Sequence, residues 1–188
     1  LTKDQQDQTI YAADASVLTP SILRNFSAPV TIDDDLSRDE RRHIMRYDTD
    51  LFNRWDSAQT LISDEILTAA ANPLAPVDDY AIAALADGFG HILADPSCLD
   101  YFKAAILTLP AISVLESRMT PADPVALFHA RLAVETALGQ HMQDHYKQAL
   151  DPQTSAKLAA TAGGRALRNR LLALAVAAGD GAADDVAT

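Results

Sequence analysis

The amino-acid sequence predicts a mainly α-helical fold, a superhelical stack of antiparallel helix pairs of the armadillo or HEAT kind, preceded by a short β-strand remnant. From residue 34 onward, apolar residues recur at steps of three and four in about seven successive segments, which is the spacing of one helix face. Short loops containing Pro or Asp separate these segments, so neighbouring helices should run antiparallel and pack as pairs. No strict period of ~34 to 47 residues is visible, so the repeat is degenerate.

The first 33 residues carry the signals of strands. Residues 8–12 and 21–28 are the two candidate strands, and Pro20 and Pro29 bracket the second, as terminal or edge positions allow. An isolated pair of strands is marginal in water, and an unpaired strand edge recruits partners. We therefore expect residues 22–28 to pair with each other, to dock on helices, or to pair across two copies of the chain.

A domain boundary is expected at residues 33–35, where three aspartates form a solvated turn. Directly after this turn, Ser37 and Glu40 have the spacing of a capping box, which predicts a short helix carrying Ile44 and Met45. The sequence thus divides into residues 1–33 and residues 34–188.

The next predicted helix, over residues 50–72, organises the rest of the chain. Asp50 can serve as its N-cap, and Asp50 and Arg54 have the spacing of an i,i+4 ion pair. Trp55, the only tryptophan, lies on the apolar stripe of this helix. We predict that Trp55 is largely buried and anchors the joint with the N-terminal strands. The stripe comprises Leu51, Trp55, Ala58, Ile62, Ile66 and Ala69.

Three further helices are expected between residue 72 and residue 120. The first begins after Asp79 and contains Gly88 and Gly90, each of which costs up to about 1 kcal/mol relative to alanine in a helix. Another helix should therefore approach closely at these glycines. The second helix closes at Pro110, and a shorter one covers residues 113–119. The residues expected to face the core are Ile82, Leu85, Phe89, Ile92, Leu99, Phe102 and Ile106.

The C-terminal third should form two long helices. Asp123 as N-cap, with Pro124 at the first helical position, opens a helix that runs to Leu150. The last helix begins at about Ser155 and is capped by Gly179. The residues expected to face inward are Val125, Phe128, Leu132, Gly139, Met142 and Tyr146 in the first helix, and Leu158, Leu167, Leu171 and Leu174 in the second.

The composition disfavours several classes of function. A net charge of -11 and a pI near 4.6 repel phosphate backbones and anionic lipids, so we expect no nucleic-acid partner and no membrane partner. The most apolar run, residues 171–178, is far shorter than the ~18 to 20 residues of a membrane helix. The single Cys98 forms no internal disulfide and fits a reducing, cytoplasmic location. Without an initiator Met or a signal-like segment, the chain is interpreted as an excised piece of a larger protein.

Four stretches of the sequence resemble the bacterial aminopeptidase N family of zinc metallopeptidases. They follow one another in the same order and at comparable spacing as in that family, and one contains the only tryptophan. The stretches are Pro-Ser-Ile-Leu-Arg-Asn-Phe-Ser-Ala-Pro-Val at residues 20–30, Asp-Leu-Phe-Asn-Arg-Trp-Asp-Ser-Ala-Gln at 50–59, Ile-Leu-Thr-Leu-Pro at 106–110 and Arg-Ala-Leu-Arg-Asn at 165–169.

The resemblance implies a place within a parent enzyme, a zinc-dependent aminopeptidase that removes N-terminal amino acids from peptides. Residues 1–33 would be the end of the family's β-sandwich domain, and residues 34–188 the N-terminal part of its C-terminal α-helical superhelical domain. That helical domain covers the catalytic cleft and restricts which peptides enter. The family's zinc motif, His-Glu-x-x-His, is absent from this sequence. The chain is therefore expected to be inactive alone and to hold no cofactor, the zinc belonging to the parent.

On this interpretation the chain scaffolds the enzyme and gates access to its active site. Its partners would be the catalytic domain of the same parent chain and, in the parent, peptide substrates. The alternative is a free-standing helical-repeat module for protein interactions, which would need a polar cap at each end of the stack.

One pair of side chains has the spacing of a metal site. His141 and His145 stand at i and i+4 on the predicted helix, but Met142 occupies the position of the catalytic glutamate of a zinc peptidase. No third ligand is evident, so the pair is interpreted as a solvated helix face. A small metalloprotein built on these two histidines is a third hypothesis. We assign no catalytic, cofactor-binding or metal-binding residue.

The remaining polar clusters have structural interpretations. The aspartates at residues 33–35 lack the glycine and the further oxygen ligands of a calcium-binding loop, and Cys98 is expected to pack in the core. The glycine pair at residues 163–164 lacks the context of a phosphate-binding loop. Isolated histidines are expected to pack or to face solvent, and the C-terminal cations to form ion pairs with neighbouring helices rather than an anion site. These are His43, His91 and His129, and Lys157, Arg165, Arg168 and Arg170.

Overall fold

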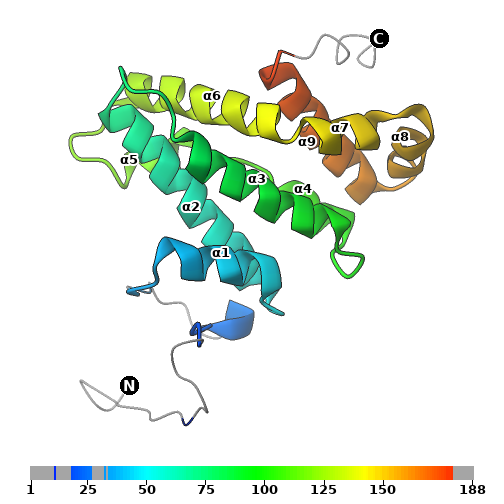
Figure 1. Cartoon of the computed structure of the whole chain (residues 1–188), viewed down its shortest axis with the longest axis horizontal. Helices are drawn as coiled ribbons and strands as arrows, with labels where there is room; N and C mark the ends of the chain where they lie inside the picture. Colours follow the sequence, from blue (N-terminus) through cyan, green and yellow to red (C-terminus); the bar gives the residue numbers. More distant parts are fainter. Residues whose placement is uncertain (1–10, 12–17, 27–31, 33, 180–188) are drawn as a thin grey trace.

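The chain folds into a stack of packed helices, which a computed structural model describes for residues 11, 18–26, 32 and 34–179. Within these residues there are nine α-helices, a single 3-10 turn and no strand, so the predicted mainly α-helical class is confirmed (Figure 1). None of the helices in this part of the chain combines the length and hydrophobicity needed to cross a lipid bilayer.

The helices follow one another with short connections. In order, they are η2 (Arg24–Phe26), α1 (Arg38–Tyr47), α2 (Leu51–Ala71), α3 (Asp79–Ala94), α4 (Asp100–Ile106), α5 (Ile112–Glu116), α6 (Pro124–His141), α7 (Gln143–Leu150), α8 (Pro152–Ala159) and α9 (Ala162–Ala177).

Side-chain caps fix the starts of most of these helices, as the sequence predicts. At α1 the Glu40 carboxylate accepts from the Ser37 amide at 2.8 Å while the Ser37 hydroxyl accepts from the Glu40 amide, which completes the capping box. The predicted cap Asp123 accepts from the first amides of α6. The other carboxylate and hydroxyl caps are Asp50, Asp78, Asp151 and Thr161.

The predicted strand at residues 21–28 is wrong for the described residues 21–26. They form a bend followed by the turn η2, in which Leu23 and Asn25 take the left-handed conformation with φ of 55° and 56°. Two such residues close together reverse the direction of the chain, so the side chains cannot alternate between two faces as they do in a strand. The turn docks on the helices, as expected. The other candidate strand, at residues 8–12, lies outside the described residues apart from Tyr11, which is not in a strand.

Helix α2 buries a face slightly rotated from the predicted stripe. Leu51 is 42% exposed, so its place on the buried stripe is wrong, whereas Trp55 is partly buried and packs against the core. The charged side chains of Arg54 and Glu65 lie on the buried side instead. The buried face comprises Arg54, Ser57, Ala58, Leu61, Ile62, Ser63, Glu65, Ile66 and Ala70.

Helix α3 lies in the interior, and its predicted stripe is confirmed. Ile82, Leu85, Phe89 and Ile92 are all at most 2% exposed. A Cβ atom added at Gly88 would lie 3.0 Å from Met45 of α1, and one added at Gly90 would lie 2.5 Å from His145 of α7. The two glycines therefore allow helices to approach α3 closely, as their positions in the sequence predict.

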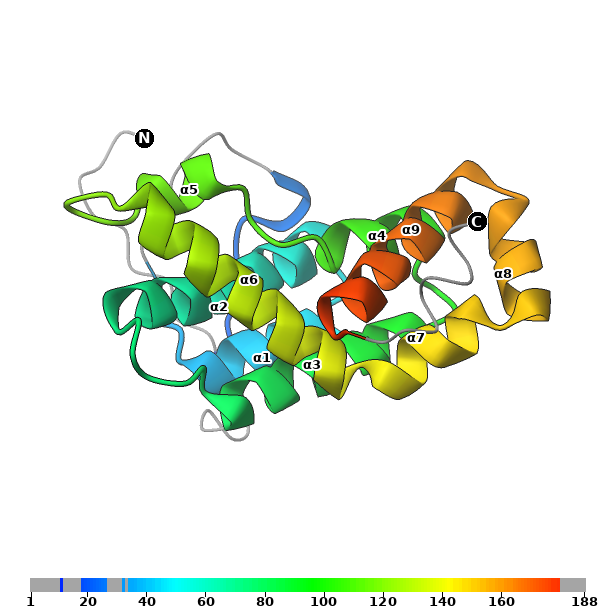
Figure 2. The ribbon, with the colours of Figure 1, turned by 90° about the horizontal axis from the view of Figure 1, so that it is seen from above.

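Helix α6 departs from the prediction in its buried face and in its length. Val125, Phe128 and Leu132 are 67%, 57% and 49% exposed, and Leu99 before α4 is 73% exposed, so these four inward assignments are wrong. The buried face of α6 comprises Leu127, Ala130, Val134, Leu138 and Gly139. The helix stops at His141, and α7 begins after Met142 in a different direction (Figure 2).

Helix α9 closes the core against the other C-terminal helices. It contacts α4, α6, α7 and α8, and it buries Leu167, Leu171 and Leu174 as predicted. Gly139 of α6 is needed here because an added Cβ would lie 2.4 Å from the Leu174 carbonyl oxygen. Buried apolar residues from Met45 to Ala175 form one continuous cluster, so the described helices share a single core.

Candidate functional site

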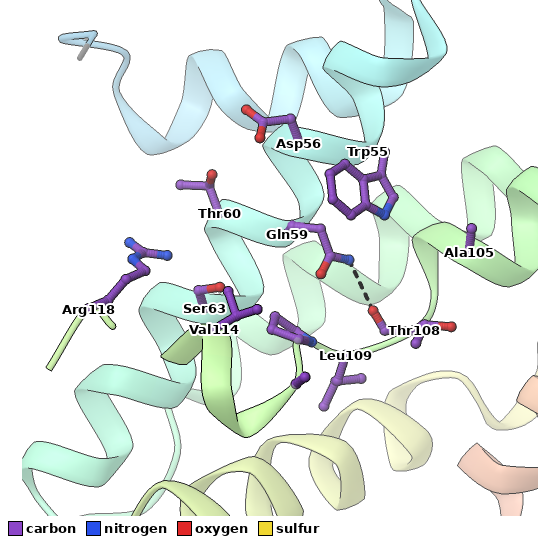
Figure 3. A pocket seen from close by; sticks show the side chains of 12 residues that line it. Trp55, Asp56, Gln59, Thr60, Ser63, Ala105, Thr108, Leu109, Val114 and Arg118 are labelled. Atoms are coloured by element: carbon purple, nitrogen blue, oxygen red, sulfur yellow. Dashed lines mark hydrogen bonds between the residues drawn. The ribbon is translucent and has the colours of Figure 1, made fainter. Parts of the chain in front are cut away.

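An open groove lies between α2 and the segment that connects α4 to α5. Its volume is about 450 Å³, and twelve residues line it (Figure 3). Trp55 and Gln59 form one side, while Leu109 and Pro110 form the other. Two of the four stretches that resemble aminopeptidase N, residues 50–59 and 106–110, therefore meet in this groove. The groove was not predictable from the sequence, because the two stretches are brought together only by the packing of α2 on α4.

The groove has an apolar floor and a polar rim held in place by hydrogen bonds. The side-chain amide of Gln59 donates to the Thr108 carbonyl oxygen at 3.0 Å, which ties the connecting segment to α2. Arg118 pairs with Asp64 across the end of the groove at 2.7 Å. Neither histidine nor cysteine is among the lining residues. An aromatic ring beside apolar and amide groups suits the binding of a polypeptide segment.

Arg54, next to Trp55 in the sequence, joins three helix ends below the groove. Its guanidinium donates to the Met45 carbonyl oxygen at 3.0 Å and pairs with Asp95 at 3.1 Å, and it lies 5.8 Å from the centre of the Phe102 ring. Asp50 instead caps α2 and accepts from Asn25, so the predicted Asp50–Arg54 pair is not formed. Arg54 therefore ties the C-terminal ends of α1 and α3 to the start of α2.

Two titratable groups around Arg54 are shifted by their surroundings. Hydrogen bonds from the Ser97 hydroxyl and amide, and then from Arg54, hold the pKa of Asp95 well below its usual range. Burial raises the pKa of the Cys98 thiol, whose sulfur lies 3.2 Å from Arg54. A thiol with a raised pKa is a poor nucleophile, so Cys98 is a packing residue, as the sequence predicts.

The two histidines proposed as a metal pair lie on separate helices and make different contacts. The Nε2 atom of His141 lies 2.8 Å from the Asp79 carboxylate on α3. The ring of His145 packs against Gly90, and its buried Nδ1 atom has no hydrogen-bond partner among the described residues. His141 is exposed as predicted, whereas His145 is partly buried and not part of a solvated face. Among the described residues, no three His, Cys, Asp or Glu side chains converge as metal ligands.

The other polar clusters make structural contacts within the described part of the chain. Asp34 forms an ion pair with Arg41. Of the C-terminal cations, Arg170 pairs with Glu135 of α6 at 2.6 Å, as predicted. Arg165 instead donates to the Ala159 carbonyl oxygen and Arg168 to the Ser155 hydroxyl. His43 and His91 pack against the ring of Tyr47, and His129 packs against the ring of Phe128.

Comparison with known proteins identifies the stack. Residues 38–188 match the family model "Domain of unknown function (DUF3458_C) ARM repeats". The chain is 41% identical over 154 residues to Aminopeptidase N of Caulobacter vibrioides, covering 79% of this chain and 17% of that protein. It is 30% identical over 125 residues to Aminopeptidase N of Escherichia coli, covering 66% of this chain and 14% of that protein.

A solved structure shares the fold. The crystal structure of Legionella pneumophila aminopeptidase A in complex with aspartic acid superimposes with a TM-score of 0.68 at 21% sequence identity, covering 87% of this chain and 20% of that one. The chain thus spans about a sixth of the length of the curated relatives it matches. The resemblance drawn from its four sequence stretches is confirmed, and the chain belongs to the DUF3458_C family of ARM-repeat domains.

Proposed function

We propose that this chain is a noncatalytic part of a zinc-dependent aminopeptidase that removes N-terminal amino acids from peptides, and that it scaffolds the enzyme and limits which peptides reach the active site. The observation that carries the proposal is the 41% identity to an aminopeptidase N over 154 residues. The division at residue 33, with the end of a β-sandwich domain before it, belongs to the same proposal, as does a cytoplasmic location.

The groove supports a role in contacting a polypeptide. It is lined by Trp55 and Gln59 on one side and by Leu109 and Pro110 on the other, and these residues come from the stretches that resemble the family. Its partner in the parent would be the catalytic domain or a peptide passing toward it. An aromatic side chain in the wall of a groove is the type of residue that dominates binding energy at interfaces.

Zinc belongs to the proposed parent rather than to this chain. The described residues do not fit a zinc site, because His141 is directed to Asp79 and His145 packs against Gly90. A zinc site needs at least three protein ligands around one ion. We therefore assign no step of the reaction to residues of this chain.

A chimera tests the proposal. The stretch of the Caulobacter aminopeptidase N that matches this chain is replaced by the chain itself, and hydrolysis of an amino-acid amide is compared with hydrolysis of a long peptide. We expect the chimera to hydrolyse both substrates. Trp55→Ala in the chimera should raise KM for the long peptide by about threefold to tenfold, since it removes binding contacts, with little change for the amide.

The matched control is Phe128→Ala, which removes another partly exposed aromatic ring but lies on α6 outside the groove. It should leave both substrates unaffected. A folded chimera with no activity toward either substrate would support the alternative, a free-standing helical-repeat module. Equal effects of Trp55→Ala and Phe128→Ala on the long peptide would remove the groove from the proposal.

A further inference from the structure

Residues 18–26, called the N-terminal strap here, are held to the corner between α1 and α2 by polar contacts. Arg24 pairs with the Asp48 carboxylate at 2.8 Å, and the Ser21 hydroxyl donates to the same carboxylate. The amide of Asn25 donates to the Asp50 carboxylate at 2.6 Å. From the other side, the Asn53 side chain donates to the Ser21 hydroxyl at 2.8 Å and to the Ile22 carbonyl oxygen at 3.0 Å.

The two carboxylates that hold the strap are buried. The side chain of Asp48 is 3% exposed, and Asp50 is 6% exposed. A buried carboxylate needs hydrogen-bond donors or an opposite charge, and the strap supplies several of them. The pKa of Asp48 is lowered overall. Burial alone would raise this pKa, but the hydrogen bonds from Ser21, the Asp50 amide and Arg24 have the larger, opposite effect. The corner is therefore built to receive the strap.

Residues 18–25 of the strap contribute no side chain to the described apolar core. The continuous core cluster among the described residues begins at Met45, after these residues. Leu18 and Ile22 of the strap are 50% and 51% exposed. A segment whose described contacts are mainly polar should open at lower free energy than the helices beneath it.

The backbone of the strap also depends on these contacts. Leu23 has a φ of 55°, a conformation that a leucine rarely adopts, and Asn25 has a φ of 56°. Such residues persist only where surrounding contacts determine the conformation. Here the Asn53 side chain donates to the Ile22 carbonyl oxygen, and the Asn25 amide donates to Asp50.

We propose that the N-terminal strap is a detachable clamp that sets the direction in which the chain enters the helical stack, and that Asp48 is its positioning residue. The helices stay folded when the clamp opens. If the chain is part of a longer aminopeptidase, as the proposed function holds, the clamp would fix the preceding domain relative to the helical stack. Opening it would change the angle between them without unfolding either.

Hydrogen exchange tests whether the clamp is separable. Asp48→Asn removes the negative charge of the Arg24–Asp48 ion pair, and Arg24→Gln removes its positive charge. The Arg24 side chain is 43% exposed, so this second variant should still fold. Each variant should raise the exchange rate of amides at residues 21–26 by about tenfold or more, since hydrogen bonds to charged groups are lost. Exchange in α3 and α9 should not change. Asp39→Asn is the control, because Asp39 lies on α1, also pairs with an arginine, and is 89% exposed.

A distance measurement tests the direction of the chain. Spin labels at Leu18→Cys and Leu132→Cys, both partly exposed positions, report the strap relative to α6. We expect one narrow distance distribution in the unaltered background and a broad one with Asp48→Asn. The proposal is overturned if the hydrogen-exchange rates of the strap amides are unchanged in both variants, or if protection is lost together in the strap and in α3. It is also overturned if the spin-label distance distribution is equally narrow with and without Asp48→Asn. Neither experiment involves peptide hydrolysis, so its failure is distinguishable from a failure of the proposed function.

Discussion

Two regions of the described stack are held together by different interactions. At the corner between α1 and α2, the buried groups are charged, namely Asp48, Asp50 and Arg54. Around α3, α6 and α9 the buried groups are aliphatic and aromatic side chains, with glycines where helices approach most closely. The stabilising free energy of apolar packing is roughly proportional to the buried area and does not depend on the direction of the contact. In the polar corner, each hydrogen-bond donor must be aligned with its acceptor. The comparison therefore predicts large, pH-independent effects in the interior and smaller, charge-dependent effects at the corner.

The largest effect is expected from Phe89→Ala in the interior of α3. Phe89 is 0% exposed, and loss of its ring leaves a cavity that the surrounding helices fill only in part. We expect a loss of about 3 to 5 kcal/mol in the free energy of unfolding, measured by urea denaturation. Phe128→Ala, at a 57% exposed position on α6, should change it by less than about 0.5 kcal/mol. Similar losses in the two variants would show that the interior is not apolar packing as described.

A smaller effect is expected from Arg54→Met at the corner. Methionine retains much of the apolar stem, but the Met45 carbonyl oxygen and the Asp95 carboxylate lose their donor. We expect a loss of about 2 to 3 kcal/mol, because a buried ion pair is broken from one side. Arg165→Met, which removes an exposed arginine on α9, is the control. An unfolding free energy equal to that of the control would mean that the corner does not depend on Arg54.

The smallest effect concerns the pH dependence of the ion pair between Asp95 and Arg54 at the corner. The pKa of Asp95 in the folded chain lies below its ordinary value of 3.8, so its ionised form stabilises the fold at pH values above the unfolded-state pKa. This contribution is lost as pH falls through the folded-state pKa. The difference in unfolding free energy between the unaltered chain and Asp95→Asn should therefore be largest near neutral pH and shrink below pH ~4. The difference between the unaltered chain and Phe89→Ala should stay constant over the same range. A constant difference for Asp95→Asn would contradict the assigned interaction.

Features set by residues close together in the sequence were the predictable ones. The capping box at Ser37 and Glu40, the cap at Asp123, and the stripe of α3 all depend on residues within one or two turns. The close approach at Gly88 and Gly90 was also predictable, since glycine inside a helix is costly unless a neighbour needs the space.

The failures arise where tertiary packing decides between local alternatives. Helix α6 carries apolar residues around much of its circumference, so its contacts with α2, α3, α5 and α9 select the buried face rather than its own periodicity. Its end at His141 has no glycine or proline to mark it. The groove beside Trp55 and the pairing of Arg54 with Asp95 depend on residues that are far apart in the chain, as does the docking of Asn25 on Asp50.

The most direct test of the central claim is an activity and metal measurement on the purified chain. An aminopeptidase needs a metal to activate water and a base to move its proton, and we propose that this chain supplies neither. Hydrolysis of an N-terminal amino-acid amide is measured with and without added Zn²⁺, together with the bound metal. The account predicts no turnover above background and no stoichiometric zinc. Stoichiometric zinc together with hydrolysis that disappears in His141→Ala would contradict it and make His141 and His145 a true metal site.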